Sequence, residues 1–311
     1  MKNYCFGIDV GGTTVKCGLF KTDGTLVDKW EIVTNTANGG EKILPDVADS
    51  VNAKIAETGI DRNDIAGIGI GVPGPVKEDG TLDGAVNLHW GFHNIVKEME
   101  DMTGLTTKAG NDANVAALGE MWKGGGAGYP NVLMVTLGTG VGGGIIVNGK
   151  IITGAHGAAG EIGHVHVDDS ITEPCNCGNR GCLEQVASAT GIVRLAKEEL
   201  SSNTEETQLT MKDLSAKTVF DAYKEKDAVA EKIVKRFANY LGTALAGFAC
   251  VVDPDIIVIG GGVSKAGEVL VDVVGNYFRE DAFPACKNTP IVLAKLGNDA
   301  GIYGSAKMVL D

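Results

Sequence analysis

Two stretches of the sequence show the same succession of apolar strands and glycine-rich turns. In the first stretch, short apolar runs at residues 4–10, 15–20 and 25–33 are separated by the turns "GGTT" and "TDG", which predicts a series of β-hairpins. Val47, Val51 and Ile55 then recur at four-residue steps, as on the buried face of a helix. The run "IAGIGIGVPGPV" that follows predicts a buried strand ended by a proline-glycine turn.

The second stretch begins with strand-like runs at residues 131–137, 142–149 and 150–154. A long helix is predicted from about Ala228 to Val252, because its apolar positions share one face. These positions are Val229, Ile233, Phe237, Leu241, Leu245 and Phe248. A strand, a glycine turn and a helix follow in "DIIVIGGGVSKAGEVLVDVV", and residues 290–296 and 300–310 predict a last strand and a C-terminal helix.

This pattern predicts an α/β protein with two similarly built halves. The similarity between "GIDVGGTTVKCGLF" and "VTLGTGVGGGIIVNG" supports an internal duplication. The polar stretch "SSNTEETQLT" at residues 201–210 is interpreted as a surface connection and not as a domain boundary.

Composition restricts the classes of partner. With 27 basic and 40 acidic residues the net charge is −13, which argues against nucleic acid as the main partner because phosphate backbones favour a basic surface. No signal-peptide pattern precedes the first strand, and no apolar run reaches the roughly 18 residues of a membrane span. We therefore expect a cytoplasmic protein with mostly reduced cysteines, in which Cys5, Cys17, Cys250 and Cys286 are small buried hydrophobic residues.

Three glycine-rich turns, each after an apolar strand, are candidates for binding phosphate. They are "DVGGTT" at 9–14, "LGTGVGGG" at 137–144 and "GGGVS" at 260–264. A single such turn usually just closes a hairpin. Three of them favour a ligand, since glycine lets backbone N–H groups converge on phosphate oxygens, and Thr13, Thr14 and Thr139 add hydroxyl donors. None matches the P-loop pattern, and a strand follows the first turn where a dinucleotide fingerprint requires a helix.

Asn111 and Asp112 stand just before a predicted helix in "KAGNDANVAALGEMW". Both are favoured helix N-caps, so capping is the ordinary interpretation. Capping is compatible with catalysis, because a helix N-terminus keeps a carboxylate ionised and phosphoryl transfer to an alcohol needs a carboxylate near the hydroxyl group.

A cysteine cluster follows in the spacing C-x-C-x₄-C, formed by Cys175, Cys177 and Cys182. In a reducing compartment three clustered thiols favour a metal over a disulfide, and three thiolates with one imidazole make a closed tetrahedral Zn²⁺ site. His164 and His166 are both candidates for the fourth ligand, because alternate residues of a strand face the same side.

Taken together, "DVGGTTVK", "LGTGVGGG", "GGGVS", the N-D pair and G-E-x-G-H followed by C-x-C-G-x-x-G-C-x-E resemble the ROK family of sugar kinases and repressors over essentially the whole chain. The resemblance implies the two-lobed actin-like ATPase fold, which is ribonuclease H-like with duplicated α/β domains. The expected small lobe is 1–110 plus 298–311, and the expected large lobe is 111–297 with the zinc-binding segment 164–182. Within the family a homodimer or homotetramer is expected.

The resemblance also assigns roles to individual residues. Nucleotide-binding residues would be Asp9, Gly11, Gly12, Thr13, Thr14 and Lys16 in the first turn, Gly138, Thr139 and Gly140 in the second, and Gly261, Gly262 and Ser264 beside the adenosine. Asp9 would help to hold Mg²⁺. Asp112 would be the catalytic base, and the sugar ligands would be Gly74, Asn111, Asp112, Glu161, His164 and Glu184.

The resemblance selects His164 over His166 as the fourth zinc ligand, with its second ring nitrogen on the sugar. Zinc would then be structural, since four protein ligands leave no open position. Asn87 is expected either near the sugar or in a loop that packs Trp90 into the core.

The activity implied is an ATP-dependent glucokinase that phosphorylates the 6-hydroxyl of glucose. Alternatives are a ROK kinase for N-acetylmannosamine, N-acetylglucosamine, fructose or allose, and a non-catalytic sugar-binding regulator. A DNA-binding repressor is disfavoured, because the first turn begins at Asp9 and leaves no room for an N-terminal helix-turn-helix. The sequence leaves open ATP or polyphosphate as the donor.

Overall fold

The computed structural model describes residues 2–311, which form two compact units. The first unit comprises Met1–Pro130, Ile146–Ala159 and Lys295–Asp311, and the second comprises Asn131–Ile145 and Gly160–Ala294. These limits differ from the expected lobes, since residues 111–130 and 146–159 belong by their contacts to the first unit. The difference has a physical cause: the helix that follows Asn111 packs on the C-terminal helix of the same unit.

A five-stranded sheet forms the centre of the first unit, in the order β3-β2-β1-β4-β7. Its strands are β1 (Tyr4–Val10), β2 (Thr14–Lys21), β3 (Leu26–Val33), β4 (Ile65–Val72) and β7 (Thr107–Asn111). β1, β2 and β3 form the predicted antiparallel hairpins, whereas β4 pairs with both β1 and β7 in parallel. The carboxyl ends of β1, β4 and β7 therefore meet at one edge of the sheet. The short strands β5 (Thr81–Leu82) and β6 (His93–Asn94) pair with each other outside this sheet.

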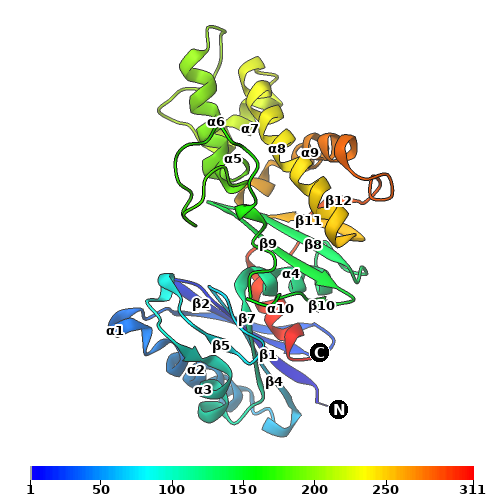
Figure 1. Ribbon diagram of the computed structural model, residues 1–311. Coiled ribbons are helices and arrows are strands. Elements are labelled where there is room, and N and C mark those ends of the chain that lie inside the picture. The colour runs from blue at the N-terminus through cyan, green and yellow to red at the C-terminus, as the bar shows by residue number, and fades with distance from the viewer. Residues whose placement is uncertain (1) are drawn as a thin grey trace. The chain divides into compact units, whose positions relative to one another are not determined.

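Helices cover both faces of this sheet (Figure 1). They are α1 (Ala37–Gly40), α2 (Ile43–Thr58), α3 (Ile95–Thr103), α4 (Asp112–Lys123) and α10 (Ala300–Met308). Apolar residues of α2 and α3 pack on one face, around Phe6 and Ile8 of β1. α10 packs on the other face so closely that a Cβ atom at Gly7 would lie 1.9 Å from the carbonyl oxygen of Ile302. Alternate residues of β1 thus face opposite helix layers, because successive side chains of a strand point to opposite faces of the sheet.

The second unit repeats the same strand order. Its sheet runs β10-β9-β8-β11-β12, which is again third, second, first, fourth and fifth along the chain. The strands are β8 (Val132–Leu137), β9 (Val141–Val147), β10 (Lys150–Ile151), β11 (Ile256–Gly260) and β12 (Ile291–Leu293), with β10 and the end of β9 counted in the first unit. β11 pairs in parallel with both β8 and β12, whereas β10 is antiparallel to β9. This shared order confirms the predicted duplicated α/β fold.

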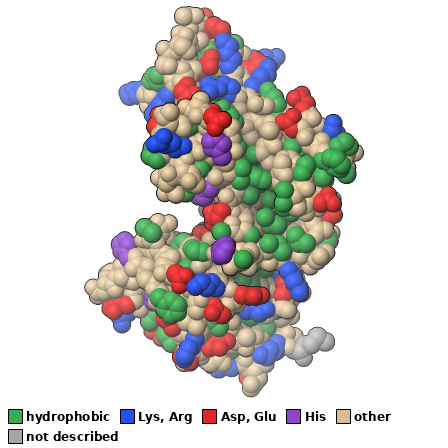
Figure 2. Space-filling model, in the orientation of Figure 1, with side chains coloured by type: hydrophobic (Ala, Val, Ile, Leu, Met, Phe, Trp, Pro, Cys, Tyr) green, Lys and Arg blue, Asp and Glu red, His purple; other side chains and the backbone are tan. Residues whose placement is uncertain are grey.

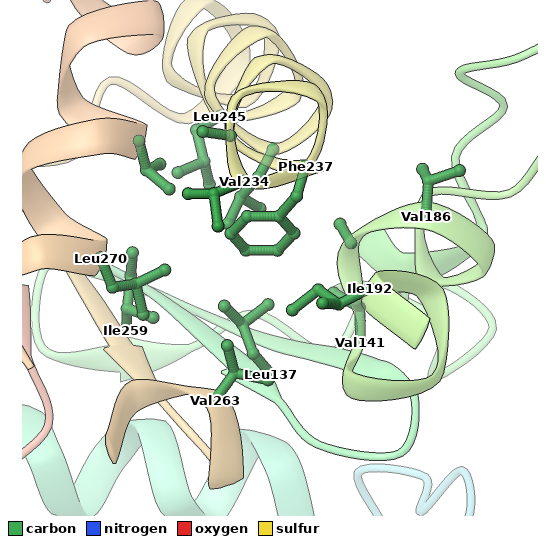
Figure 3. Packing of buried hydrophobic residues seen from close by; sticks show 14 of the residues in the cluster. Leu137, Val141, Val186, Ile192, Val234, Phe237, Leu245, Ile259, Val263 and Leu270 are labelled. Carbon is green, nitrogen blue, oxygen red and sulfur yellow. The ribbon is translucent and has the colours of Figure 1, made fainter. Parts of the chain in front are cut away.

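Helices of the second unit pack on the sheet and enclose one apolar core (Figure 3). They are α5 (Glu184–Ala187), α6 (Ala189–Ser202), α7 (Ala216–Lys224), α8 (Ala228–Val252) and α9 (Glu268–Asp281). Phe237 of α8 lies at the centre and points toward Leu137 of β8 and Ile192 of α6. The predicted limits of the long helix are confirmed, and its predicted apolar face is buried or packed against this core.

One expectation about the cysteines is wrong. Cys5, Cys17 and Cys286 are buried as expected, but Cys250 is exposed. It lies two residues beyond Phe248, and a step of two residues along a helix turns a side chain away from the buried face.

On the face seen in Figure 2, acidic and basic side chains are interspersed over both units. Among residues 2–311, none of the helices combines the length and the apolar character that crossing a lipid bilayer demands.

Candidate active site

The first glycine turn connects β1 to β2 at the edge of the first sheet. Gly11 N–H donates to the carbonyl of Thr14 at 3.0 Å and closes the turn. Thr34, which directly follows β3, donates twice: its N–H to the Thr13 carbonyl at 3.0 Å and its hydroxyl to the Gly11 carbonyl at 2.6 Å. Gly12 and Thr13 remain exposed at the tip. The carbonyls of Gly11, Thr13 and Thr14 therefore accept hydrogen bonds within the protein, and the tip of the turn is accessible.

Asp9 and Lys16 stand opposite each other at the base of this turn. Burial raises the pKa of the Asp9 carboxyl to about 6, the Lys16 ammonium opposes this shift, and the nearby Asp112 carboxylate adds to it. The Lys16 ammonium donates to the Asn298 carbonyl at 2.9 Å. Asp9 packs against α10, where a Cβ atom at Gly301 would lie 2.5 Å from its carboxylate. Two carboxylates and one ammonium are thus brought together beside a glycine turn, an arrangement suited to a cation and a polyphosphate.

Asn111 ends β7 and caps α4, as the ordinary interpretation of the N-D pair predicts. Its side-chain oxygen accepts from the N–H groups of Ala113 and Asn114 at 3.0 and 3.2 Å, and its amide nitrogen donates to the Gly74 carbonyl at 3.1 Å. The Gly74 backbone is held at φ 100°, which favours glycine. Asp112 is the first residue of α4, and its carboxylate accepts from Ala113 N–H at 2.8 Å. Asn111, Asp112 and Gly74 therefore share the sheet edge with Asp9.

The second and third turns lie together at the carboxyl ends of β8 and β11 in the second unit. Gly261 has φ 82°, and a Cβ atom there would lie 2.5 Å from the Leu137 carbonyl oxygen, so this position requires glycine. Ser264 lies in a 3₁₀ turn (Gly262–Ala266), where its hydroxyl donates to the Gly261 carbonyl at 2.7 Å. The two turns therefore lie side by side.

A cavity of about 160 Å³ opens beside the third turn. Its apolar wall comes from Ala216 and Phe220 of α7 with Val263 and Ala266 of the 3₁₀ turn, and lysine side chains lie around it. A second hollow reaches from Thr139 along α6 to Ala216. An apolar cavity beside a backbone turn suits a nucleotide, which has a flat base and phosphates that accept hydrogen bonds.

The cluster predicted to bind metal is assembled in the second unit. One donor atom from each of His164, Cys175, Cys177 and Cys182 lies within 4.8 Å of the others. The Sγ atoms of Cys177 and Cys182 are 3.7 Å apart, and Nδ1 of His164 is 3.6 Å from Sγ of Cys175. A tetrahedral Zn²⁺ ion with bonds of roughly 2.3 Å to sulfur and 2.0 Å to nitrogen needs separations of about 3.8 and 3.5 Å. The donor set therefore fits Zn²⁺.

His164 belongs to a 3₁₀ turn (Ile162–His164) that directs its two ring nitrogens to different groups. Nδ1 faces the cysteines and lies 3.8 Å from Oε1 of Glu184, whereas Nε2 lies 3.8 Å from Oε2 of Glu161. The resemblance assigned zinc to one nitrogen and sugar to the other, and this geometry suits that division. His166 is exposed and occupied elsewhere, by the Arg180 carbonyl and the Asp169 carboxylate, at 2.9 and 2.8 Å.

Glu184 links the metal cluster to the second glycine turn. Its Oε1 accepts from the Cys175 thiol at 2.9 Å. Its Oε2 lies so close to the turn that a Cβ atom at Gly140 would be 2.4 Å from it. Burial raises the pKa of the Cys175 thiol to about 12, so a bound metal ion would have to displace this proton.

Some residues around the site carried no clear signal in the sequence. Glu120 of α4 is fully buried, and its carboxylate accepts from the N–H groups of Gly125, Lys295 and Leu296. It fixes the segment that carries Asn298, the partner of Lys16. In the sequence, this role could be inferred only from the position of a single glutamate on the buried face of an amphipathic helix.

Asn87 lies beside the first turn. A Cβ atom at Gly12 would be 3.5 Å from the Asn87 carbonyl oxygen. The same loop buries Trp90, whose indole donates to the Gly40 carbonyl at 3.0 Å. This loop therefore buries Trp90 in the core and leaves Asn87 exposed.

The fold and these groups define a class of protein with duplicated α/β units, glycine turns for polyphosphate and a carboxylate at a helix N-terminus. A family model described as "ROK family" matches residues 5–311. The chain belongs to the ROK family. It is 46% identical over 310 residues to a glucokinase of Halalkalibacterium halodurans, an alignment that covers 97% of this chain and 94% of the relative.

Two solved structures are similar over nearly the whole chain. One is a ROK family glucokinase from Streptomyces griseus in complex with glucose and AMPPNP, 31% identical, with 98% of each chain covered and a TM-score of 0.73. The other is a ROK hexokinase from Thermus thermophilus, 30% identical, with 97% of this chain and 96% of that chain covered and a TM-score of 0.80. These likenesses confirm the predicted family and fold.

Proposed function

We propose that the protein is an ATP-dependent glucokinase, which transfers the γ-phosphate of ATP to the 6-hydroxyl of glucose. The observation that carries this proposal is the position of Asp112, at the N-terminus of α4 and near Asp9. Full-length similarity to a glucokinase, and to a structure with glucose and AMPPNP, supports the sugar and the nucleotide.

Asp112 is the catalytic base in this proposal. Its carboxylate is held by Ala113 N–H at the positive end of α4, which favours the ionised form. A weak base suffices, because in a loose transition state the attacking hydroxyl loses its proton late. The barrier is lowered chiefly by positioning and by neutralising charge on the phosphates.

The phosphates would be held by the backbone N–H groups of the two hairpin turns and by Lys16. Asp9 would hold Mg²⁺, which neutralises phosphate charge when bound. Gly261, Gly262 and Ser264 would lie beside the adenosine, with the cavity at Phe220 and Val263 as a seat for the base. Thr14 and Thr139 would contribute hydroxyl donors.

Glucose would be bound by acceptors for paired hydroxyl groups. The proposed sugar ligands are Asn111 with the neighbouring Gly74 backbone, and Glu161, His164 and Glu184 around the metal cluster. Zn²⁺ on His164 and the three cysteines would fix the ring orientation of His164 and leave its Nε2 for the sugar. The subunits would assemble as a homodimer or homotetramer.

The alternatives are separated by one assay. Coupled ADP release is measured with Mg²⁺-ATP and a panel of glucose, fructose, allose, N-acetylglucosamine and N-acetylmannosamine. With polyphosphate as the donor no ADP is formed, so the sugar phosphate is measured instead. The proposal predicts the highest kcat/KM for glucose with ATP. A higher kcat/KM for another sugar would reassign the substrate, and no ADP release with any sugar would favour a non-catalytic sugar-binding protein.

A further inference from the structure

In each hairpin turn, two carbonyl groups accept hydrogen bonds from residues outside the turn. In the first turn, the Thr34 hydroxyl donates to the Gly11 carbonyl at 2.6 Å, and the Thr34 N–H donates to the Thr13 carbonyl at 3.0 Å. In the second turn, the Thr190 hydroxyl donates to the Thr139 carbonyl at 2.7 Å, and Ala189 N–H donates to the Gly138 carbonyl at 2.8 Å. Each turn thus receives one threonine hydroxyl and one backbone N–H.

The two threonines come from different kinds of element. Thr34 follows β3 and is only 7% exposed. Thr190 stands in the first turn of α6, where its hydroxyl also lies 2.9 Å from that of the capping residue Ser188. The hydroxyl that holds the turn therefore comes from the end of a strand in the first case and from the start of a helix in the second.

These hydrogen bonds to the carbonyls determine where the N–H groups of the turns point. In a trans peptide the C=O and the following N–H point in opposite directions. A Gly11 carbonyl held by Thr34 directs the N–H of Gly12 to the opposite side, and a Thr139 carbonyl held by Thr190 does the same for Gly140. A hydrogen bond of this kind also keeps the carbonyl oxygens, which repel anions, away from the ligand.

We propose that Thr34 and Thr190 are positioning residues for the phosphates of ATP, each orienting the backbone N–H groups of one turn through its side-chain hydroxyl. The inference rests on the proposed kinase function and extends it to two residues outside the glycine motifs. Each hydroxyl donates to a carbonyl of its turn, so each threonine acts on ATP binding through that turn.

The test compares Thr34→Val and Thr190→Val with the wild-type enzyme. Valine keeps the shape of threonine and removes the hydroxyl, so each turn keeps its backbone N–H donor and loses one fastening. We expect KM for ATP to rise about tenfold in each variant, the change that one weakened hydrogen bond to a charged group produces. The dissociation constant for glucose, measured by calorimetry without nucleotide, should stay within about twofold of the wild-type value.

Two controls separate positioning from ordinary stabilisation. Thr34→Ser and Thr190→Ser retain the hydroxyl and should restore KM for ATP to within about threefold of the wild-type value. Thr103→Val removes a hydroxyl about as buried as that of Thr34, which donates to the Met99 carbonyl at 2.7 Å in α3, and should lower Tm without raising KM for ATP.

The inference is overturned if the valine variants raise KM for ATP no more than Thr103→Val does, or if the serine variants are as impaired as the valine variants. Its failure is distinct from failure of the proposed function. If the wild-type protein released no ADP with glucose, calorimetry with a non-hydrolysable ATP analogue would still compare nucleotide binding in these variants.

Discussion

Gly140 lies in a turn that we propose binds nucleotide, yet the structure predicts that its replacement by alanine damages sugar binding. An alanine Cβ at this position would lie 2.4 Å from Oε2 of Glu184, where about 3.4 Å is an ordinary contact, so the carboxylate must retreat by roughly 1 Å. The clash is with the end of a flexible side chain, and the Gly140 backbone does not have positive φ. We therefore expect the variant to fold, with a change of less than about 1 kcal/mol in the free energy of unfolding.

The size of the effect follows from what Glu184 would do for the sugar. A hydrogen bond to a charged group is worth about 1.5–3 kcal/mol, so a displaced carboxylate weakens glucose binding by roughly 10- to 150-fold. Isothermal titration calorimetry with glucose and no nucleotide measures this directly. The effect on KM for ATP should be smaller, because the alanine leaves the backbone N–H in place.

A matched control is available two residues away. At Gly138 an added Cβ would have its nearest neighbour, the Gly140 carbonyl oxygen, at 4.0 Å, so Gly138→Ala meets no carboxylate. Glucose affinity in Gly138→Ala should stay within about twofold of the wild-type value. If Gly140→Ala is folded and binds glucose as tightly as the wild type, or if both variants lose the same affinity, Glu184 does not act as reasoned here.

Three further predictions concern the base, the metal and the buried carboxyl. Asp112→Asn should lower kcat by a factor on the order of 10² or more while glucose binding stays measurable by calorimetry, and near-normal kcat would remove Asp112 from the chemistry. Removal of zinc by a chelator should abolish glucose binding, whereas full affinity in protein shown by elemental analysis to be zinc-free would refute the role given to His164. Without Mg²⁺, burial raises the pKa of Asp9 to about 6, so the folded state binds this proton more tightly than the unfolded state. The protonated carboxyl therefore contributes to stability at low pH, and this contribution is lost as pH rises through 6. Asp9→Asn should therefore be more stable than the wild type at pH 8 and lose this advantage near pH 4 in denaturant titrations; a pH-independent difference would contradict the shift.

The strands and the long helices could be predicted because their periodicity is local. The apolar face of α8, with Phe237 at its centre, was readable because the whole helix packs on one core. The identical strand order of the two sheets follows from the repeated strand-and-turn pattern. The burial of Cys250 was mispredicted, since an apolar segment does not by itself say which residues of a helix face inward.

The candidate site could be predicted only as far as its motifs are contiguous. The metal ligands lie within one short segment, and the structure brings their donor atoms together. The contact of Glu184 with Gly140 joins residues 44 positions apart, and the bond from Thr34 to Gly11 joins a strand end to a turn. Such contacts depend on the register of the sheet and on where the helices pack, and neither can be predicted from a single sequence.

The central claim is a phosphoryl transfer from ATP to O6 of glucose, and the most direct measurement identifies the product. Phosphorus-31 NMR of a reaction containing the enzyme, Mg²⁺-ATP and glucose should show ADP and glucose 6-phosphate in equal amounts, and 6-deoxyglucose should give no phosphorylated sugar. A phosphorylated product from 6-deoxyglucose, or ADP and inorganic phosphate without a sugar phosphate, would contradict the account.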